Sequence, residues 1–400
     1  MGCTLRVAIV HYWLLNRRGG ERVIEALCEL FPQSDLFALV ANPGLLSPEL
    51  REHKLTTSWL QKMPGSARWH RYLLPLYPLA VEQFDLRGYD LVISTESGPA
   101  KGVLTAPETC HICYCSTPMR YIWNSYHEYK NGSRLGPVGK LVFGISAHYA
   151  RMWDLASAAR VDYFAANSQH IAARIRKYYR RQAEVIYPPV RVSGAPPHEA
   201  TQDYYLYVGQ LVNYKRVDLA IAACNQLGRS LRVVGVGEEY HRLRRMAGKT
   251  VSFLGGALSD EEVWKQYSGC RALLFPGEED FGIVPVEAQA CGRPVIAFGK
   301  GGARETILGA DGGGFRNPER STGVFFARQE VSSLVQAIRD FEKIEHRFSP
   351  FLIRHNAERF DKQHFLRRMA SFVAEKLAEH REPSRLDQQQ EYATVAADGR

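Results

Sequence analysis

The sequence has 400 residues, of which 45% are hydrophobic and 23% charged, and its formal net charge is +9. This length fits two domains of about 150–200 residues each, and the composition is ordinary for a globular protein. No apolar run reaches the roughly 18 residues of a membrane-spanning helix, so none is expected, and the mildly basic charge attracts nucleic acid, anionic membranes or phosphorylated ligands.

Short apolar runs alternate with amphipathic segments along the first half of the chain. Such alternation predicts a parallel β-sheet covered by helices on both faces. The expected strands are residues 5–13, 90–95, 110–115 and 183–190, and the expected helices are residues 20–31 and 172–179.

The same alternation resumes after a stretch rich in proline and polar residues at 188–203. We therefore predict an α/β protein with two Rossmann-like domains in tandem. The predicted strands of the second half are 204–210, 231–237, 251–256, 270–277 and 293–299, and its helices are 218–227, 331–342 and 357–379. The predicted division is a first domain over 1–190, a linker over 191–203, a second domain over 204–355, a helix over 356–381 that crosses back to the first domain, and a disordered tail over 382–400.

Three of the eight cysteines, Cys110, Cys113 and Cys115, lie in one predicted strand. Because side chains alternate along a strand, Cys113 and Cys115 share a face and Cys110 takes the other. A zinc site needs a second pair of ligands, and His111 is the one nearby candidate. We therefore expect reduced thiols in the core, as in a cytoplasmic protein.

The segment 273–307 carries the strongest functional signal. It predicts a strand that ends at Phe275, an acidic loop, and a helix that starts near Gly282 and stops at Gly292. The free N–H groups at a helix start, here those of Phe281, Gly282 and Ile283, favour an anion such as phosphate.

Two carboxylates, Glu279 and Glu287, flank this predicted anion site. Carboxylates accept hydrogen bonds from sugar hydroxyls and are poor partners for phosphate. A phosphate at the helix start with hydroxyl-rich rings on either side describes a nucleotide sugar. The alternative is an acidic surface loop before an ordinary helix.

Around these carboxylates the sequence EDFGIVPVEAQACGRPVIA resembles the signature of family-4 retaining glycosyltransferases of the GT-B fold. The whole pattern is most similar to bacterial mannosyltransferases that build O-antigen and exopolysaccharide. Further segments that resemble the family are residues 11–27, 113–129, 161–179, 207–221 and 299–306.

The resemblance implies two Rossmann-like domains that face each other across a cleft. It also implies transfer of a hexose, from GDP-mannose, to a lipid-linked oligosaccharide or a polysaccharide, with no metal or other cofactor. The implied location is the cytoplasm, with peripheral attachment at the inner face of the cell membrane.

The resemblance also implies a role for each matching residue. Glu287 would hold the donor ribose, Glu279 would contact the transferred sugar, and Lys215 would neutralise the diphosphate. Leu254 would meet the nucleobase. The implied donor-binding set is Gly19, Gly20, Gln210, Lys215, Leu254, Glu279, Phe281, Gly282, Ile283 and Glu287, and the implied catalytic set is Glu279, Lys215 and Ser116.

Two positions depart from the family pattern, and they keep other functions open. Gln210 stands where arginine is usual, and Ser116 stands where close relatives often carry histidine. One alternative is a non-catalytic, nucleotide-sugar-binding subunit of a polysaccharide assembly complex, and another is a transferase that uses a UDP-sugar. Nucleic-acid binding is not expected because the basic residues form no recognisable binding motif.

One further segment, 68–81, suits an anionic membrane surface. It combines basic, aromatic and apolar residues, as side chains at a headgroup interface do. The equal alternative is a core helix interrupted by Pro75 and Pro78. Residues 1–187 hold 22 basic and 15 acidic residues, so most of the positive excess lies in this half.

Overall fold

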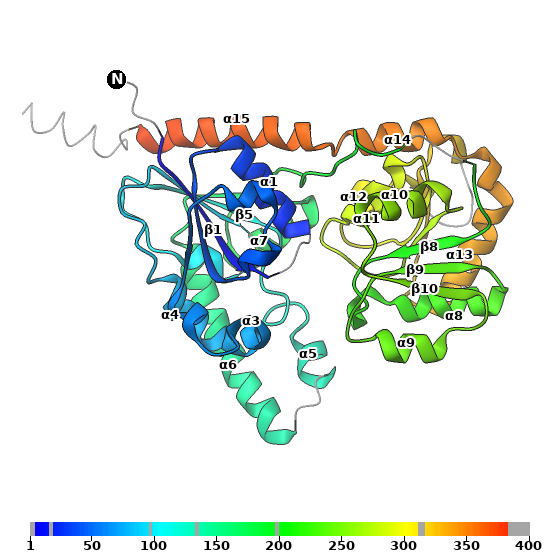
Figure 1. Ribbon diagram of the computed structural model, residues 1–400, viewed down its shortest axis with the longest axis horizontal. Coiled ribbons are helices and arrows are strands. Elements are labelled where there is room, and N and C mark those ends of the chain that lie inside the picture. Colours follow the sequence, from blue (N-terminus) through cyan, green and yellow to red (C-terminus); the bar gives the residue numbers. More distant parts are fainter. Residues whose placement is uncertain are drawn as a thin grey trace, which may run out of the picture. The chain divides into compact units, whose positions relative to one another are not determined.

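The computed structural model describes residues 5–15, 19–95, 98–132, 136–196, 200–310 and 317–382. The chain forms two compact units, each built on one parallel β-sheet (Figure 1). The first unit takes residues up to Asn167, Ile171–Ile186, and residues from Leu366 onward, and the second takes Ser168–His170 and Tyr187–Phe365. The predicted α/β class with two Rossmann-like domains is confirmed.

The sheet of the first unit has the strand order β3-β2-β1-β4-β5-β6-β7, and the paired strands are all parallel. The order reverses between β1 and β4. Its central strands are buried on both faces, which is typical of a parallel sheet covered by helices. The strands are β1 (Val7–Leu14), β2 (Asp35–Ala41), β3 (Leu55–Thr57), β4 (Leu91–Thr95), β5 (Cys110–Cys115), β6 (Tyr163–Ala166) and β7 (Glu184–Val185).

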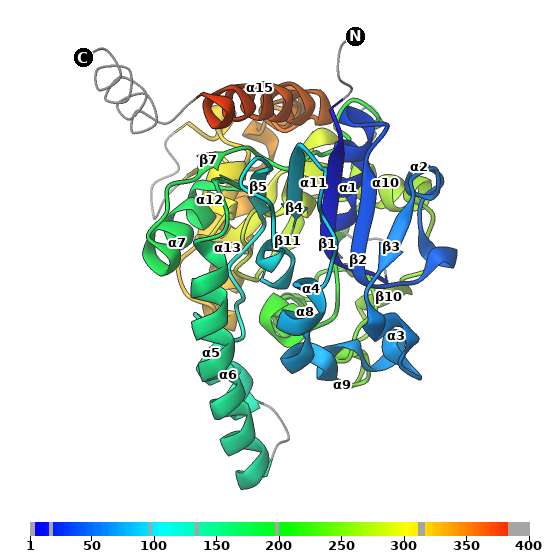
Figure 2. The ribbon, with the colours of Figure 1, turned by 90° about the vertical axis from the view of Figure 1, so that its left-hand side faces the viewer.

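Helices cover this first sheet on both sides (Figure 2). They are α1 (Gly19–Leu30), α2 (Pro48–Arg51), α3 (Ser66–Trp69), α4 (Tyr77–Val81), α5 (Tyr126–Gly132), α6 (Pro137–Ala158), α7 (Gln169–Tyr179) and, from Leu366 onward, α15 (Lys362–Arg381). The longest of them, α6, extends beyond the edge of its sheet in both views (Figures 1 and 2). The sequence analysis did not predict this helix.

The sheet of the second unit repeats this plan with the order β10-β9-β8-β11-β12-β14-β13. Its order reverses between β8 and β11. The strands are β8 (Tyr205–Val208), β9 (Leu231–Val234), β10 (Val251–Gly255), β11 (Leu273–Phe275), β12 (Val295–Phe298), β13 (Gly309–Ala310) and β14 (Gly323–Phe326), and the helices are α8 (Val217–Leu227), α9 (Tyr240–Met246), α10 (Asp260–Gly269), α11 (Ile283–Ala290), α12 (Ala303–Thr306), α13 (Val331–Ile344) and α14 (Pro350–Glu358).

The residues between the two sheets differ from the strand predicted over 183–190 and from the linker predicted over 191–203. The strand predicted over 183–190 is only two residues long, and it ends before Pro188 and Pro189, which have no N–H to donate to a ladder. Beyond them, Val190, Val192 and Ala195 are buried in the core of the second unit. This part of the predicted linker is therefore packed structure, and residues 383–400 of the predicted tail lie outside the described residues.

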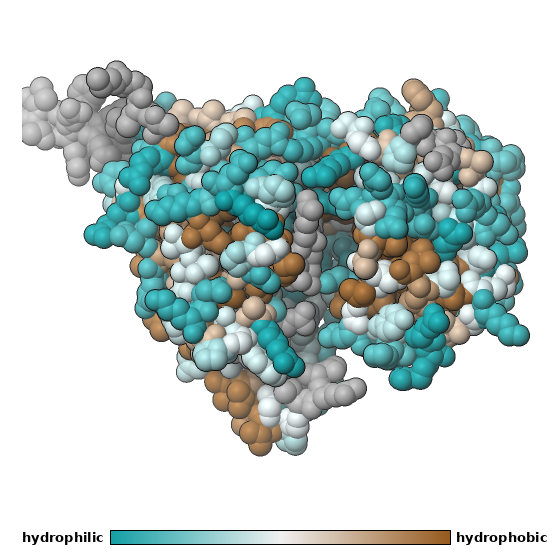
Figure 3. Space-filling view, viewed as in Figure 1, coloured by the Kyte–Doolittle hydropathy of each residue, from teal (hydrophilic) through white to brown (hydrophobic). Residues whose placement is uncertain are grey.

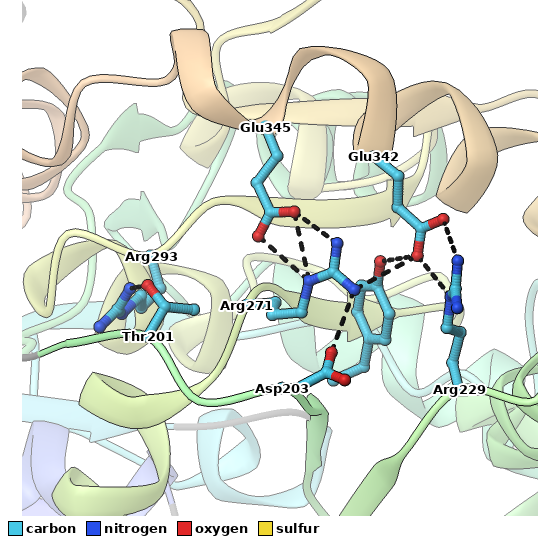
Figure 4. Close-up of polar contacts among 8 residues, drawn as sticks. Thr201, Asp203, Arg229, Arg271, Arg293, Glu342 and Glu345 are labelled. Carbon is cyan, nitrogen blue, oxygen red and sulfur yellow. Dashed lines mark hydrogen bonds and ion pairs between the residues drawn. The ribbon is translucent and has the colours of Figure 1, made fainter.

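A network of charges ties α13 to the amino-terminal edge of the second sheet (Figure 4). Arg271, two residues before β11, reaches Glu345 at 2.5 Å and Glu342 at 3.4 Å. Arg229 donates to both oxygens of Glu342 at 2.7 and 2.8 Å, and Tyr205 donates to the same carboxylate at 2.9 Å. Hydrogen bonds to Glu345 raise the pKa of Arg271. The network lies at the edge of the sheet opposite to the carboxyl ends of the strands.

The cysteines of the 110–115 strand are core residues, as predicted. Cys110, Cys113 and Cys115 are all buried, and Cys113 and Cys115 pack in the same apolar cluster. Burial raises the pKa of Cys110 to about 12, so its thiol stays protonated.

The segment 68–81 is divided between surface and core. Trp69 and Leu79 are exposed, whereas Tyr77 is buried and Leu73 packs against the core cluster of the first unit. Three short helical pieces replace one helix, since the prolines interrupt the hydrogen-bond ladder. Within the described part of the chain, no helix is both long enough and apolar enough to span a membrane.

Candidate functional site

The second unit brings two loops together where its strand order reverses. Residues 209–216 follow β8 and residues 276–282 follow β11, and these two strands are neighbours. Parallel strands present their carboxyl ends at one edge of the sheet. Where the strand order reverses, the loops after the two adjacent strands run in opposite directions, and such loops form a crevice between them. This is where an open α/β sheet binds its ligand.

Lys215 and Glu279 meet at this point. The Lys215 Nζ lies 2.8 Å from the Glu279 Oε1, and the two side chains are only 14% and 22% exposed. Gly277 makes the approach feasible, because a Cβ on Gly277 would lie 2.9 Å from the Cα of Lys215. The structure thus places two of the predicted residues side by side, and it adds Gly277, which the sequence analysis did not single out.

The helix that follows starts where the sequence predicts. α11 begins at Ile283 after Gly282, whose φ of 92° is in the left-handed region that favours glycine. The Phe281 ring is buried against Tyr187 and Phe360, with ring centroids 5.7 and 5.4 Å away. The side chain of Phe281 is therefore part of the core, and what this turn offers a ligand is backbone N–H from a helix start.

Glu287 lies inside α11 with a fixed carboxylate. The Tyr267 hydroxyl, at the end of α10, donates to its Oε2 at 2.8 Å, and both residues are buried. A hydrogen bond of this kind sets the direction of a carboxylate before any ligand arrives. Tyr267 is a functional candidate that sequence reasoning missed, since nothing in its local pattern signals a partner on another helix.

A glycine pair supports the acidic loop from the side. The Gly302 N–H donates to the Glu279 backbone oxygen at 2.8 Å. A Cβ on Gly302 would lie 2.3 Å from the Cα of Phe281, and one on Gly301 would lie 2.3 Å from the Glu279 backbone oxygen. Only glycine fits at either position, so this pair allows the segment 299–306 to pack closely against the loop that carries Glu279.

A second glycine contact supports the loop after β8. A Cβ on Gly235 would lie 1.9 Å from the backbone oxygen of Gly209, so the loop after β9 rests directly on the loop after β8. The Tyr207 hydroxyl donates to the Gln210 backbone oxygen at 3.2 Å. Burial, with a smaller contribution from Glu279, raises the pKa of Tyr207 well above its ordinary value, so the hydroxyl remains a donor.

The remaining predicted residues are distributed over both units. Leu254 is partly buried in β10 and packs against the apolar cluster that contains Val286 of α11. Gly19 and Gly20 form the first turn of α1, and Ser116 follows β5 with its side chain partly exposed, all three in the first unit. The structure brings Lys215 and Glu279 together. The roles of the other predicted residues, in both units, stay expectations.

One group in the described part of the chain could hold a metal ion. Potential ligand atoms of Cys110, Asp162 and His380 lie within 4.8 Å of one another in the first unit. Metals bind the thiolate, and the raised pKa of Cys110 opposes its formation. We assign no function to this group.

The ribose role that the resemblance implies for Glu287 predicts that Glu287→Ala weakens nucleotide binding by about tenfold or more, because that role makes its carboxylate an acceptor for ribose hydroxyls. Titration calorimetry with the free nucleotide measures this. Glu279→Ala is the matched control: it should lower turnover with the nucleotide still bound. A Glu287→Ala protein that binds nucleotide as tightly as the original protein contradicts the ribose role.

Comparison with known proteins adds a family match for the second unit. Residues 193–360 match the model of the family described as glycosyl transferases group 1. The matched range contains Gln210, Lys215, Leu254, Glu279 and Glu287.

Curated relatives match over shorter stretches. An uncharacterized glycosyltransferase of Methanocaldococcus jannaschii is 30% identical over 146 residues, which cover 35% of this chain and 41% of that protein. The human alpha-1,3/1,6-mannosyltransferase ALG2 is 36% identical over 101 residues, which cover 24% of this chain and 23% of that protein. A GDP-mannose-dependent monoacylated alpha-(1-6)-phosphatidylinositol monomannoside mannosyltransferase of Corynebacterium glutamicum is 38% identical over 93 residues, covering 20% of this chain and 24% of that protein. The chain thus spans less than half the length of these relatives.

Solved structures match along nearly the whole chain. Sucrose-phosphate synthase from Thermosynechococcus elongatus superposes with a TM-score of 0.66 at 17% identity, over 94% of this chain and 100% of that one. Anabaena HepE in complex with UDP superposes with a TM-score of 0.64 at 15% identity, over 93% of this chain and 100% of that one. At such identities the likeness shows the fold alone, which is the two-domain GT-B fold.

Proposed function

We propose that this protein is a retaining glycosyltransferase that moves mannose from GDP-mannose to a lipid-linked or polysaccharide acceptor in cell-surface glycan synthesis. The observation that carries the proposal is the meeting of Lys215 and Glu279 where the strand order reverses, inside the range that matches glycosyl transferases group 1. The curated mannosyltransferases among the relatives support the choice of sugar. Its place of action would be the cytoplasmic face of the membrane.

The proposed chemistry uses the charges of this site. The diphosphate leaves with growing negative charge, which the Lys215 ammonium and the start of α11 stabilise, so transfer would need no metal ion. Glu279 would accept hydrogen bonds from hydroxyls of the transferred sugar, and Glu287 from those of the ribose. The leaving phosphate would take the proton of the acceptor hydroxyl, and the new bond would form on the face from which the diphosphate departs.

Specific observations favour two other functions. A UDP-sugar donor is suggested by Anabaena HepE, whose structures contain UDP and UDP-glucose. A non-catalytic, nucleotide-sugar-binding subunit is suggested by Gln210 and Ser116, which stand where the resembled family carries arginine and often histidine. The first alternative changes the base that binds, and the second removes transfer while keeping binding.

A thermal-shift panel of GDP, UDP, ADP and their sugars separates these functions. We expect GDP and GDP-mannose to raise the unfolding temperature, since a ligand at 100 times its dissociation constant adds about 2.7 kcal/mol of stability. A shift by UDP with none by GDP would reject the mannose donor. Incubation with GDP-mannose and a membrane extract should then yield mannosylated lipid or glycan, at a rate that a metal chelator leaves unchanged; binding without any transfer would favour the non-catalytic subunit.

A further inference from the structure

Helix α6 exposes an apolar stripe along most of its length. Its exposed side chains recur every three or four residues and are apolar or aromatic except for His148. Figure 3 shows apolar surface gathered over the projecting part of this helix. The most exposed members are Val138 (75%), Leu141 (65%), Val142, Ile145, Tyr149 and Met152.

The opposite face of α6 is firmly anchored, so the exposed stripe does not reflect loose packing. Asp154 and Lys101 form a buried ion pair in the first unit. The Trp123 Nε1 and the Tyr179 hydroxyl also donate to the Asp154 carboxylate, at 2.7 and 2.9 Å. Nearer the middle of the helix, Ala147 packs in an apolar cluster of the same unit.

The charges in this region have one predominant sign. Residues 120–151 contain five basic residues and a single acidic one, Glu128. Within α6 itself, Lys140 and Arg151 are basic, and the one acidic residue, Asp154, is buried. The sequence that contains the exposed apolar face of α6 therefore carries a net positive charge.

We propose that α6 is the element by which this protein docks on an anionic lipid surface, with its apolar stripe at the boundary between headgroups and acyl chains. An amphipathic helix with aliphatic and aromatic residues on one face and basic residues nearby suits that boundary. A second copy of this chain fits less well, because two such regions would meet with like charge. This inference deepens the proposed function and rests on it for its purpose, which is to meet a lipid-linked acceptor.

Vesicle flotation at low salt tests the proposal directly. The protein should float with vesicles of phosphatidylcholine and phosphatidylglycerol and float poorly with phosphatidylcholine alone. Leu141→Gln with Ile145→Gln should lower the partition coefficient on the order of a hundredfold, since each removes a large apolar side chain from the interface. Lys140→Gln should lower it about fivefold on the anionic vesicles only.

Two controls keep the result specific. Phe351→Gln changes a more exposed apolar side chain on α14 of the second unit and should leave flotation unchanged. Trp69→Gln tests the segment 68–81, and loss of flotation in this variant with retention in the α6 variant would overturn the proposal. A second result would also overturn the proposal. In it, the original protein binds no vesicles and sediments as a dimer, and the α6 substitutions convert that dimer to a monomer.

The assay distinguishes failure of docking from failure of the proposed function. It needs neither donor nor acceptor, and the α6 variant should keep the thermal shift with nucleotide, since its substitutions lie in the other unit from Lys215 and Glu287. Flotation without a thermal shift by any nucleotide would support docking and contradict the proposed transferase function. A thermal shift by nucleotide without flotation would support nucleotide binding and contradict docking.

Discussion

Replacing Lys215 with alanine is expected to lower the transfer rate by about tenfold to a hundredfold, the equivalent of one hydrogen bond to a charged group. The loss has two parts. The diphosphate loses a cation, and the mostly buried Glu279 carboxylate, now without its partner at 2.8 Å, repels the same ligand. Both contributions are measured by kcat and KM together with the dissociation constant of the free nucleotide diphosphate.

Four further variants sharpen this test. Glu279→Ala in the Lys215→Ala background should restore part of the nucleotide affinity, because the unpaired carboxylate is removed. Gln210→Ala should reduce activity distinctly less than Lys215→Ala, and Gln210→Arg should be tolerated and tighten donor binding. Lys343→Ala removes an exposed lysine from α13 and serves as the control. Unchanged turnover and unchanged donor affinity in Lys215→Ala would contradict the role proposed for Lys215.

Replacing Asp154 with alanine is expected to destabilise the first unit by about 3–5 kcal/mol, as removal of one partner from a buried ion pair does. Lys101 is 2% exposed, and its ammonium would keep the Ser157 hydroxyl at 3.0 Å but lose its counter-ion. Trp123 and Tyr179 would each lose an acceptor. Urea unfolding followed by tryptophan fluorescence measures the change.

The matched control is the ion pair of Asp85 and Arg87, which is exposed on both sides. Asp85→Ala should leave the urea midpoint unchanged, because water and salt screen such a pair. Replacing both buried charges, with Lys101→Met and Asp154→Leu, should recover part of the stability, since no unpaired charge is left inside while Trp123 and Tyr179 still lack their acceptor. An Asp154→Ala protein that unfolds at the same urea concentration as the original would contradict the buried pair.

The elements around the candidate site follow from local sequence signals. The end of β11 at Phe275, the start of α11 after Gly282 and its stop before Gly292 were all predicted, and the two glycines have φ of 92° and 70°. Apolar runs separated by amphipathic helices predicted both parallel sheets. These features depend on residues close together in the chain, so the sequence by itself determined them.

Only the tertiary structure decided which side chains meet. Tyr267 reaches Glu287 from another helix, and Gly277 and Gly302 let loops approach within distances that any Cβ would prevent. Burial of Val190 and Val192 likewise depends on a core built from distant segments. The sequence analysis did not predict α6, and whether another element covers its apolar face is a property of the fold. The physical reason is the same in each case: burial and pairing are set by neighbours in space, which a local pattern does not contain.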